Sequence, residues 1–203
     1  MLIEANPDTL VVACEHLIKN NLSSKANFIA AFVSDTDDTE VKLWTVGLGS
    51  ASSCYPEHAK SASSIGSYIC VPTITLDTVC SLYGIIPDLI KIDVEGAEYE
   101  VLRGSARLAS HQSSRFFVEV HANPSLPLLK NTVNILRWCD EVEYRAWYLK
   151  EAVHLADASQ IKPGGGCHLL LQPASWKYPE WLKGIAESSN LAEILQATEN
   201  EPL

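Results

Sequence analysis

Residues 88–98 read DLIKIDVEGAE, an apolar run that stops at two acids and a glycine. The apolar run predicts a buried strand, and a helical pattern begins directly after Gly96, whose missing Cβ permits a tight turn. A strand that ends at a carboxylate and turns into a helix places that carboxylate at the carboxyl-terminal edge of a sheet. Open α/β folds bind their ligands at this edge, so Asp93 is a candidate site residue.

The helix predicted after Gly96 has one apolar face. Its members are Ala97, Val101, Leu102, Leu108 and Ala109. Glu98 falls in the first turn, where the helix dipole favours an anion, and is predicted to be a helix-start residue rather than a catalytic one. Asp93 directly follows apolar residues, so we expect it near buried surface, with Glu95 on the same face.

Three further segments accompany this stretch in order along the chain. They are residues 3–7 (IEANP), residues 71–77 (VPTITLD) and residues 116–121 (FFVEVH). Together with residues 88–98, they resemble the FkbM-type methyltransferase family, whose members use S-adenosylmethionine to methylate hydroxyl groups. Four matches in the same order and with compatible spacing are more specific than any one of them.

The resemblance implies an α/β fold, a Rossmann-like class I methyltransferase sheet that closes with a C-terminal antiparallel hairpin. Residues 144–149 and 167–172 are predicted to form this hairpin. We expect a partial methyltransferase domain over residues 1–173 and a C-terminal helical extension, packed on it, over residues 174–203. The extension has an amphipathic pattern, so a contact between copies in a homo-oligomer is an alternative role for it.

One part of the family pattern is not found in the printed sequence. The family's first strand and its glycine-rich turn normally precede the segment that contains Glu4. The triple glycine at 164–166 precedes a strand rather than a helix, so it is predicted to be a flexible turn. The domain is therefore expected to be a fragment, with the first strand and helix missing and the central position of the sheet open. A natural short form, with another segment in that position, is the alternative.

The resemblance implies S-adenosylmethionine as cofactor and suggests which residues hold it. Glu4 would accept hydrogen bonds from the ribose hydroxyls, with Asn6 shaping the adjacent turn. Ser34 and Asp35 would border the adenine, and Asp93 would support the positively charged end of the cofactor. The alternatives are a solvated acid at a helix start for Glu4 and ordinary loop residues for Ser34 and Asp35.

Methyl transfer to a hydroxyl needs groups that orient the acceptor oxygen and help to remove its proton. Asp93, Glu95, Glu119 and His121 are the candidates. Glu119 and His121 share a face of their strand because side chains alternate, and an imidazole titrates near neutral pH. A structural hydrogen bond for His121, and a turn-stabilising role for Asp93, are the alternatives.

Two other functions stay open. Asp93, Glu119 and His121 could serve a metal-dependent hydrolase, and a partial fold could be a non-catalytic interaction module. The other histidines, including His58 and His168, are predicted to be surface or packing residues. The acceptor, whether a sugar (glycan), a lipid-linked group or another small molecule with a hydroxyl, is not readable from the residues.

Composition limits the kinds of partner that the protein can bind and the cellular compartment in which it is expected. The net charge is -10 without a basic run, which argues against nucleic acid. We find neither a signal peptide nor an apolar run long enough to span a membrane. The six cysteines form no Cys-x-x-Cys pair, which disfavours a zinc knuckle and indicates a reducing, cytoplasmic location.

Overall fold

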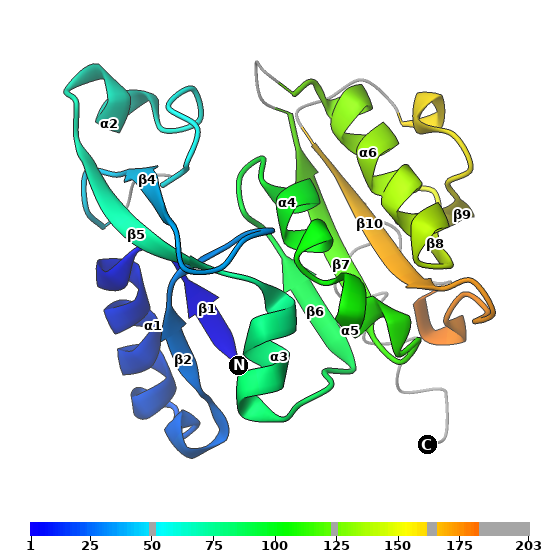
Figure 1. Cartoon of the computed structure of the whole chain (residues 1–203), viewed down its shortest axis with the longest axis horizontal. Coiled ribbons are helices and arrows are strands. Elements are labelled where there is room, and N and C mark those ends of the chain that lie inside the picture. The colour runs from blue at the N-terminus through cyan, green and yellow to red at the C-terminus, as the bar shows by residue number, and fades with distance from the viewer. Residues whose placement is uncertain (49–51, 123–125, 162–165, 183–203) are drawn as a thin grey trace, which may run out of the picture.

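The computed structural model describes residues 1–48, 52–122, 126–161 and 166–182. Within them the chain is a mixed α/β structure with three sheets (Figure 1). The predicted α/β class is therefore confirmed. Residues 164 and 165 of the triple glycine, and most of the predicted C-terminal extension, lie outside the described residues, so these two predictions are not tested.

The largest sheet has five strands and carries most of the core. In spatial order they are β6 (Leu89–Ile92), β7 (Arg115–His121), β10 (Gly166–Pro173), β8 (Tyr144–Tyr148) and β9 (Val153–His154). β6 and β7 are parallel, as expected for two strands joined through helices. β10 is antiparallel to both β7 and β8, so the predicted C-terminal antiparallel pair is confirmed.

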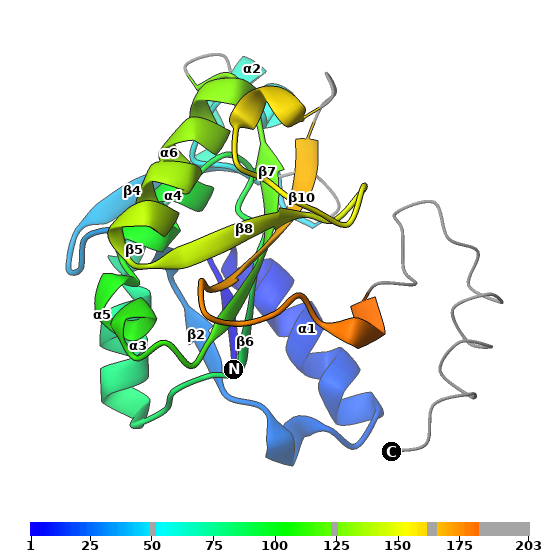
Figure 2. The same ribbon diagram turned by 90° about the vertical axis from the view of Figure 1, so that its right-hand side faces the viewer.

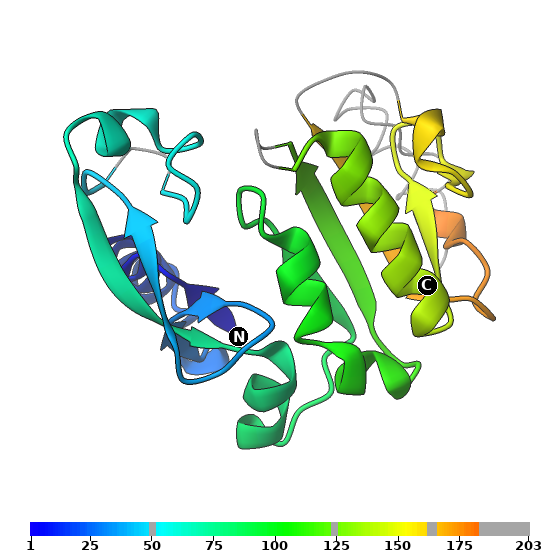
Figure 3. The same ribbon diagram turned by 45° about the horizontal axis from the view of Figure 1, so that its top comes forward.

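Two smaller sheets are formed by the N-terminal part of the chain. One pairs β1 (Leu2–Glu4) in parallel with β2 (Phe28–Ala30). The other contains, in spatial order, β3 (Phe32–Val33), β5 (Tyr68–Ile74) and β4 (Glu40–Trp44). Figure 3 shows these two sheets on one side of the molecule and the five-stranded sheet on the other.

Six α-helices and three short 3₁₀ helices are present in the described part of the chain. The α-helices are α1 (Pro7–Lys19), α2 (Lys60–Ser64), α3 (Leu76–Tyr83), α4 (Glu98–Arg103), α5 (Ala106–Ser110) and α6 (Leu128–Glu141). The 3₁₀ helices are η1 (Ser23–Lys25), η2 (Ala158–Gln160) and η3 (Glu180–Leu182). Helices α4, α5 and α6 cover one face of the five-stranded sheet (Figures 1 and 2). None of the helices among the described residues has both the length and the apolar character that a bilayer crossing requires.

The core lies between these helices and the sheet. Leu102 of α4, Ile135 of α6, Phe116 of β7 and Leu169 of β10 are fully buried. The rings of Phe116 and Trp138 meet edge to face with their centroids 5.5 Å apart. Each such side chain contributes about 1.5–3 kcal/mol when it leaves water, so this layer fixes β6 and β7 firmly beneath α4 and α6.

The single helix predicted after Gly96 is wrong, because the structure contains two helices, α4 and α5. The chain bends at Gly104, which packs against Ser34, directly after β3, and against Thr75. A Cβ at Gly104 would lie 2.1 Å from the carbonyl oxygen of Ser34, so this position has no room for a side chain. The tertiary contact, and not the local apolar pattern, therefore sets the end of α4.

Two strand edges face a common cavity. Among the described residues, β1 pairs only with β2, and β6 pairs only with β7. Residues of both β1 and β6 line an apolar cavity of about 470 Å³, which also reaches Val33 and Leu76. In the predicted class I sheet the first strand would lie between these two strands, and that placement stays a prediction.

Candidate functional site

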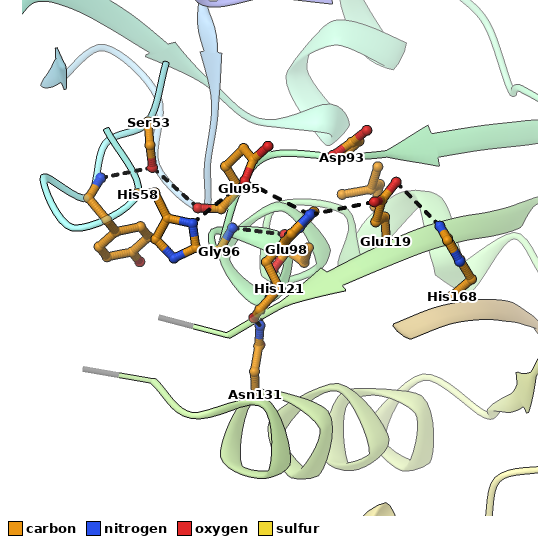
Figure 4. Close-up of polar contacts among 12 residues, drawn as sticks. Ser53, His58, Asp93, Glu95, Gly96, Glu98, Glu119, His121, Asn131 and His168 are labelled. Atoms are coloured by element: carbon orange, nitrogen blue, oxygen red, sulfur yellow. Dashed lines mark hydrogen bonds and ion pairs between the residues drawn. The ribbon is translucent and has the colours of Figure 1, made fainter. Parts of the chain in front are cut away.

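The carboxyl ends of β6 and β7 bring the predicted catalytic residues together. The two strands are in register, with Ile92 opposite Val118, so their ends lie at the same edge of the sheet. Asp93 and Glu95 follow β6, and His121 ends β7. Figure 4 shows these side chains and Glu119 gathered at this edge.

Glu119 stands among three basic groups. Its Oε2 atom lies 3.0 Å from Lys91 Nζ and 3.4 Å from His168 Nε2, and its Oε1 atom lies 3.6 Å from His121 Nε2. The hydrogen bond from Lys91 is the main cause that lowers the pKa of Glu119. The predicted common face of Glu119 and His121 is confirmed by their contact.

His121 is held by a fully buried carboxylate. Its Nδ1 atom lies 2.9 Å from Glu98 Oε1, and the same oxygen accepts a hydrogen bond of 2.9 Å from the Gly96 N–H. The other oxygen, Oε2, accepts one of 3.0 Å from Asn131 Nδ2. The hydrogen bond to Glu98 is the largest cause that raises the pKa of His121 to about 9. His121 is therefore an imidazolium at neutral pH in the free protein.

Sequence reasoning recognised only half of the role of Glu98. Helix α4 does begin at Glu98, as predicted. The side chain, however, turns inward and is 0% exposed. No local signal separates a buried first-turn acid from a solvated one, because its partners His121 and Asn131 are 23 and 33 residues away in sequence.

Glu95 occupies an unusual backbone conformation at the turn after β6. Its φ angle is +52°, in the left-handed region that costs a non-glycine residue about 1 kcal/mol or more. Its Oε2 atom lies 3.5 Å from His58 Nδ1 and 3.9 Å from His121 Nε2. The Ser53 hydroxyl donates a 3.2 Å hydrogen bond to its carbonyl oxygen. The prediction that His58 and His168 have no role beyond surface or packing overlooked these contacts.

Asp93 lies between this cluster and the N-terminal strands. Its side chain is 46% exposed and its Oδ2 atom lies 3.4 Å from Lys91 Nζ. Asp93 and Glu4 line the same cavity of about 270 Å³, together with apolar residues of β1 and β3. The sequence predicts that Asp93 lies near buried surface, and the structure places it in the wall of this cavity.

Glu4 and Asn6 form the other wall. Glu4 ends β1, and its Oε1 atom accepts a 2.7 Å hydrogen bond from the Asn6 N–H. Asn6 is 1% exposed; its side-chain oxygen accepts from the Asp8 N–H and caps α1, while its Nδ2 donates to Thr45 Oγ1 at 3.2 Å. Asn6 thus shapes the turn beside Glu4, as the sequence predicts.

Ser34 and Asp35 take a different position. Neither residue is among those that line the two cavities reached by Glu4. The carboxylate of Asp35 forms a 2.8 Å ion pair with Arg103, and the Ser34 hydroxyl donates to Asp35 Oδ1 at 3.3 Å. Contact of these two residues with an adenine ring stays a prediction.

A third cavity adjoins the cluster on the side of His58. It measures about 570 Å³ and is open to solvent. Its polar lining includes Glu57, His58 and Lys60, and Ala122 directly after His121 completes it.

Acids and a histidine at the carboxyl ends of neighbouring parallel strands, next to a cavity, define an α/β fold with its site at the usual ligand-binding edge. The family model of the methyltransferase FkbM domain matches residues 1–146. The chain belongs to this methyltransferase family, and the predicted family is confirmed.

Two further comparisons complete this result. The crystal structure of the methyltransferase FkbM from Methylobacillus flagellatus KT is similar over 83% of this chain and 35% of that chain, with 15% sequence identity and a TM-score of 0.48. The chain therefore spans about one third of the length of that protein. A search of curated proteins finds no match.

Proposed function

We propose that the chain forms part of an S-adenosylmethionine-dependent O-methyltransferase that acts on a hydroxyl of a sugar, lipid-linked or small-molecule acceptor. The observation that carries the proposal is the shared cavity of Glu4 and Asp93, at the carboxyl ends of β1 and β6. Membership of the methyltransferase family supports the reaction type.

The residues present fit part of the cofactor. Glu4 offers carboxylate oxygens to the two ribose hydroxyls, which are hydrogen-bond donors. The cofactor supplies a methyl group on a positively charged sulfur, and Glu4, Asp93 and Glu95 give the cavity an acidic lining that suits this charge. A cavity of about 270 Å³ is slightly smaller than the range that encloses a drug-sized ligand, about 300–1,000 Å³. The adjoining cavity between β1 and β6 shares Ile3, Glu4 and Asp93 with it.

The acceptor would bind next to the cluster, in the cavity beside His58. Asp93 and Glu119 are carboxylates that can take up the proton of the acceptor hydroxyl. His121, as an imidazolium, can donate a hydrogen bond to the acceptor oxygen through Nε2, because Glu98 occupies Nδ1. Glu95 stands between His58 and His121 and would hold both rings in place.

Calorimetric titration with S-adenosylmethionine tests the proposal. We use the present chain and a version that carries an additional upstream strand and glycine-rich turn of the family type. We expect the longer version to bind because the added strand would pair with the open edges of β1 and β6. Glu4→Gln in that version should weaken binding by about 10- to 100-fold, the loss of one or two charge-assisted hydrogen bonds.

The matched control is Glu40→Gln, an exposed acid on β4 outside the cavities, which should leave the affinity unchanged. Absence of binding by both versions would overturn the proposal and favour a non-catalytic interaction module. Equal affinity of the Glu4→Gln and unmodified longer versions would overturn the assignment of Glu4 alone.

We further propose a reducing, cytoplasmic location. No disulfide joins any of the six cysteines in the structure. Disulfides form and persist in oxidising compartments, so reduced thiols at two buried and four more accessible positions suit the cytoplasm.

A further inference from the structure

Asp93, Glu95 and His121 bring three metal-binding atoms together at the edge of the sheet. One carboxylate oxygen from each acid and one imidazole nitrogen all lie within 4.8 Å of one another. No other group of three or more His, Cys, Asp or Glu side chains comes together in this way within the described ranges. From this geometry we propose that Asp93, Glu95 and His121 bind one divalent cation of the Mn²⁺ or Mg²⁺ type.

The spacing of the three atoms is close to that of a coordination shell. Ligand atoms of an octahedral ion bound at about 2.1 Å are about 3.0 Å apart when adjacent and about 4.2 Å apart when opposite. His121 Nε2 and Glu95 Oε2 are 3.9 Å apart, within this interval. The side chains of Asp93 and Glu95 are 46% and 39% exposed, so both can rotate to close the remaining distance.

The histidine is fixed in the manner of a metal ligand. A metal-binding imidazole usually donates its second N–H to a carboxylate, which sets the orientation of the ring. Glu98 provides this carboxylate at 2.9 Å from Nδ1, which leaves Nε2 directed at the acids. A cation that binds at Nε2 would displace the proton that this nitrogen carries in the free protein, and the released proton would pass to solvent. Glu98 is itself fully buried and held by Gly96 N–H and Asn131 Nδ2. Glu98, which orients the imidazole, is therefore held as rigidly as the core around it.

The charge of the cluster also favours a cation. Three carboxylates, those of Asp93, Glu95 and Glu119, meet at this edge. Lys91 is the ammonium group that contacts two of them, at 3.4 Å from Asp93 Oδ2 and 3.0 Å from Glu119 Oε2. A divalent ion would compensate the acids more completely, and Lys91 would compete with it for Asp93.

The donor set selects the class of metal. Two carboxylates and one imidazole are mainly hard oxygen ligands, which suit Mg²⁺ and Mn²⁺ better than thiol-binding metals. Three protein ligands leave about three positions of an octahedral ion for water or for oxygen atoms of an acceptor. Binding of the cation itself does not depend on the proposed methyl transfer.

Titration of the full chain with Mn²⁺ alone, without S-adenosylmethionine, tests this inference. Free Mn²⁺ gives a paramagnetic resonance signal that decreases on binding, so the bound fraction is measured directly. We expect one saturable site per chain, from which Mg²⁺ displaces Mn²⁺. Asp93→Asn and Glu95→Gln should each weaken binding at least about tenfold. Lys91→Met, which removes the competing ammonium, should tighten binding about two- to fivefold.

Glu40→Gln is the control, because it removes the same charge from an exposed position on β4. Circular dichroism and thermal unfolding establish that each variant is folded. Absence of saturable Mn²⁺ binding by the unmodified chain overturns the inference. It is equally overturned if the Asp93→Asn and Glu95→Gln chains bind as tightly as the Glu40→Gln chain. Because no cofactor is present, failure here is distinct from failure to bind S-adenosylmethionine.

Discussion

Glu98→Gln is the substitution that most directly probes how the site is built. The change keeps the size of the side chain but replaces one acceptor oxygen with an NH₂ group. In the native structure Oε1 accepts from Gly96 N–H and from His121, and Oε2 accepts from Asn131 Nδ2. A glutamine that keeps the first two contacts therefore points a donor at the Asn131 donor.

The expected cost follows from the alternatives open to the variant. Asn131 Oδ1 is buried without a partner. If the Asn131 amide rotates, this oxygen can accept a hydrogen bond from the new NH₂ group. This rotation would break the 3.1 Å hydrogen bond from Asn131 Nδ2 to the His121 carbonyl oxygen. Either way one buried hydrogen bond is lost, which destabilises the protein by about 1–3 kcal/mol. The midpoint of thermal unfolding should fall by about 4–8 °C for a loss of about 2 kcal/mol.

Urea unfolding followed by tryptophan fluorescence measures the change, with Glu100→Gln as the matched control. Glu100 lies on the same helix, receives one hydrogen bond from Tyr55 and has its other oxygen buried without a partner. Burial raises the pKa of Glu100, so its surroundings disfavour the charged form and an amide should cost less there than at Glu98. If the two variants lose equal stability, the argument that Glu98 is a buried anchor for His121 is refuted.

Two further predictions concern the scaffold around the site. Gly104→Ala should lower the free energy of unfolding by about 1–3 kcal/mol or more, because the new Cβ would meet the Ser34 carbonyl at 2.1 Å; an unchanged urea midpoint would contradict this. Burial raises the pKa of Asp37, but hydrogen bonds from Thr75 and Thr78 outweigh it and hold that pKa below 3.8. The stability that Asp37 provides is therefore present above pH 3.8 and is lost as the pH falls through its folded pKa. Asp37→Asn should remove part of the stability difference between neutral and acidic pH. Urea unfolding of both chains at several pH values measures this difference, and an unchanged pH dependence would contradict the prediction.

The sequence was sufficient to predict β6, β7 and the gathering of Asp93, Glu95, Glu119 and His121 at their ends. Apolar runs locate the two strands, and parallel neighbours place their carboxyl ends together, so the site follows from local patterns. The antiparallel pair of β8 and β10 was predicted for the same reason. These features depend on residues adjacent in sequence or on the regular geometry of a sheet.

The features that sequence reasoning missed all depend on contacts between distant segments. The break after α4 results from the approach of Gly104 to Ser34, 70 positions earlier in the numbering. His58 reaches Glu95 from a loop that shows no periodicity. His168 reaches Glu119 because β10 inserts beside β7. The periodicity of the sequence cannot predict contacts between such distant residues until the order of the strands is known.

Glu95 connects the strained part of the site with its chemistry. A non-glycine residue with φ of +52° persists only where surrounding contacts compensate for its cost. Here the Ser53 hydroxyl binds the Glu95 carbonyl, and His58 and His121 flank the carboxylate. Glycine at this position would relieve the backbone and remove the carboxylate, so the presence of glutamate is more readily explained by the side chain than by the turn. The strain at Glu95 is therefore best understood as the cost of placing a carboxylate between two histidines, where either a cation or an acceptor would need it.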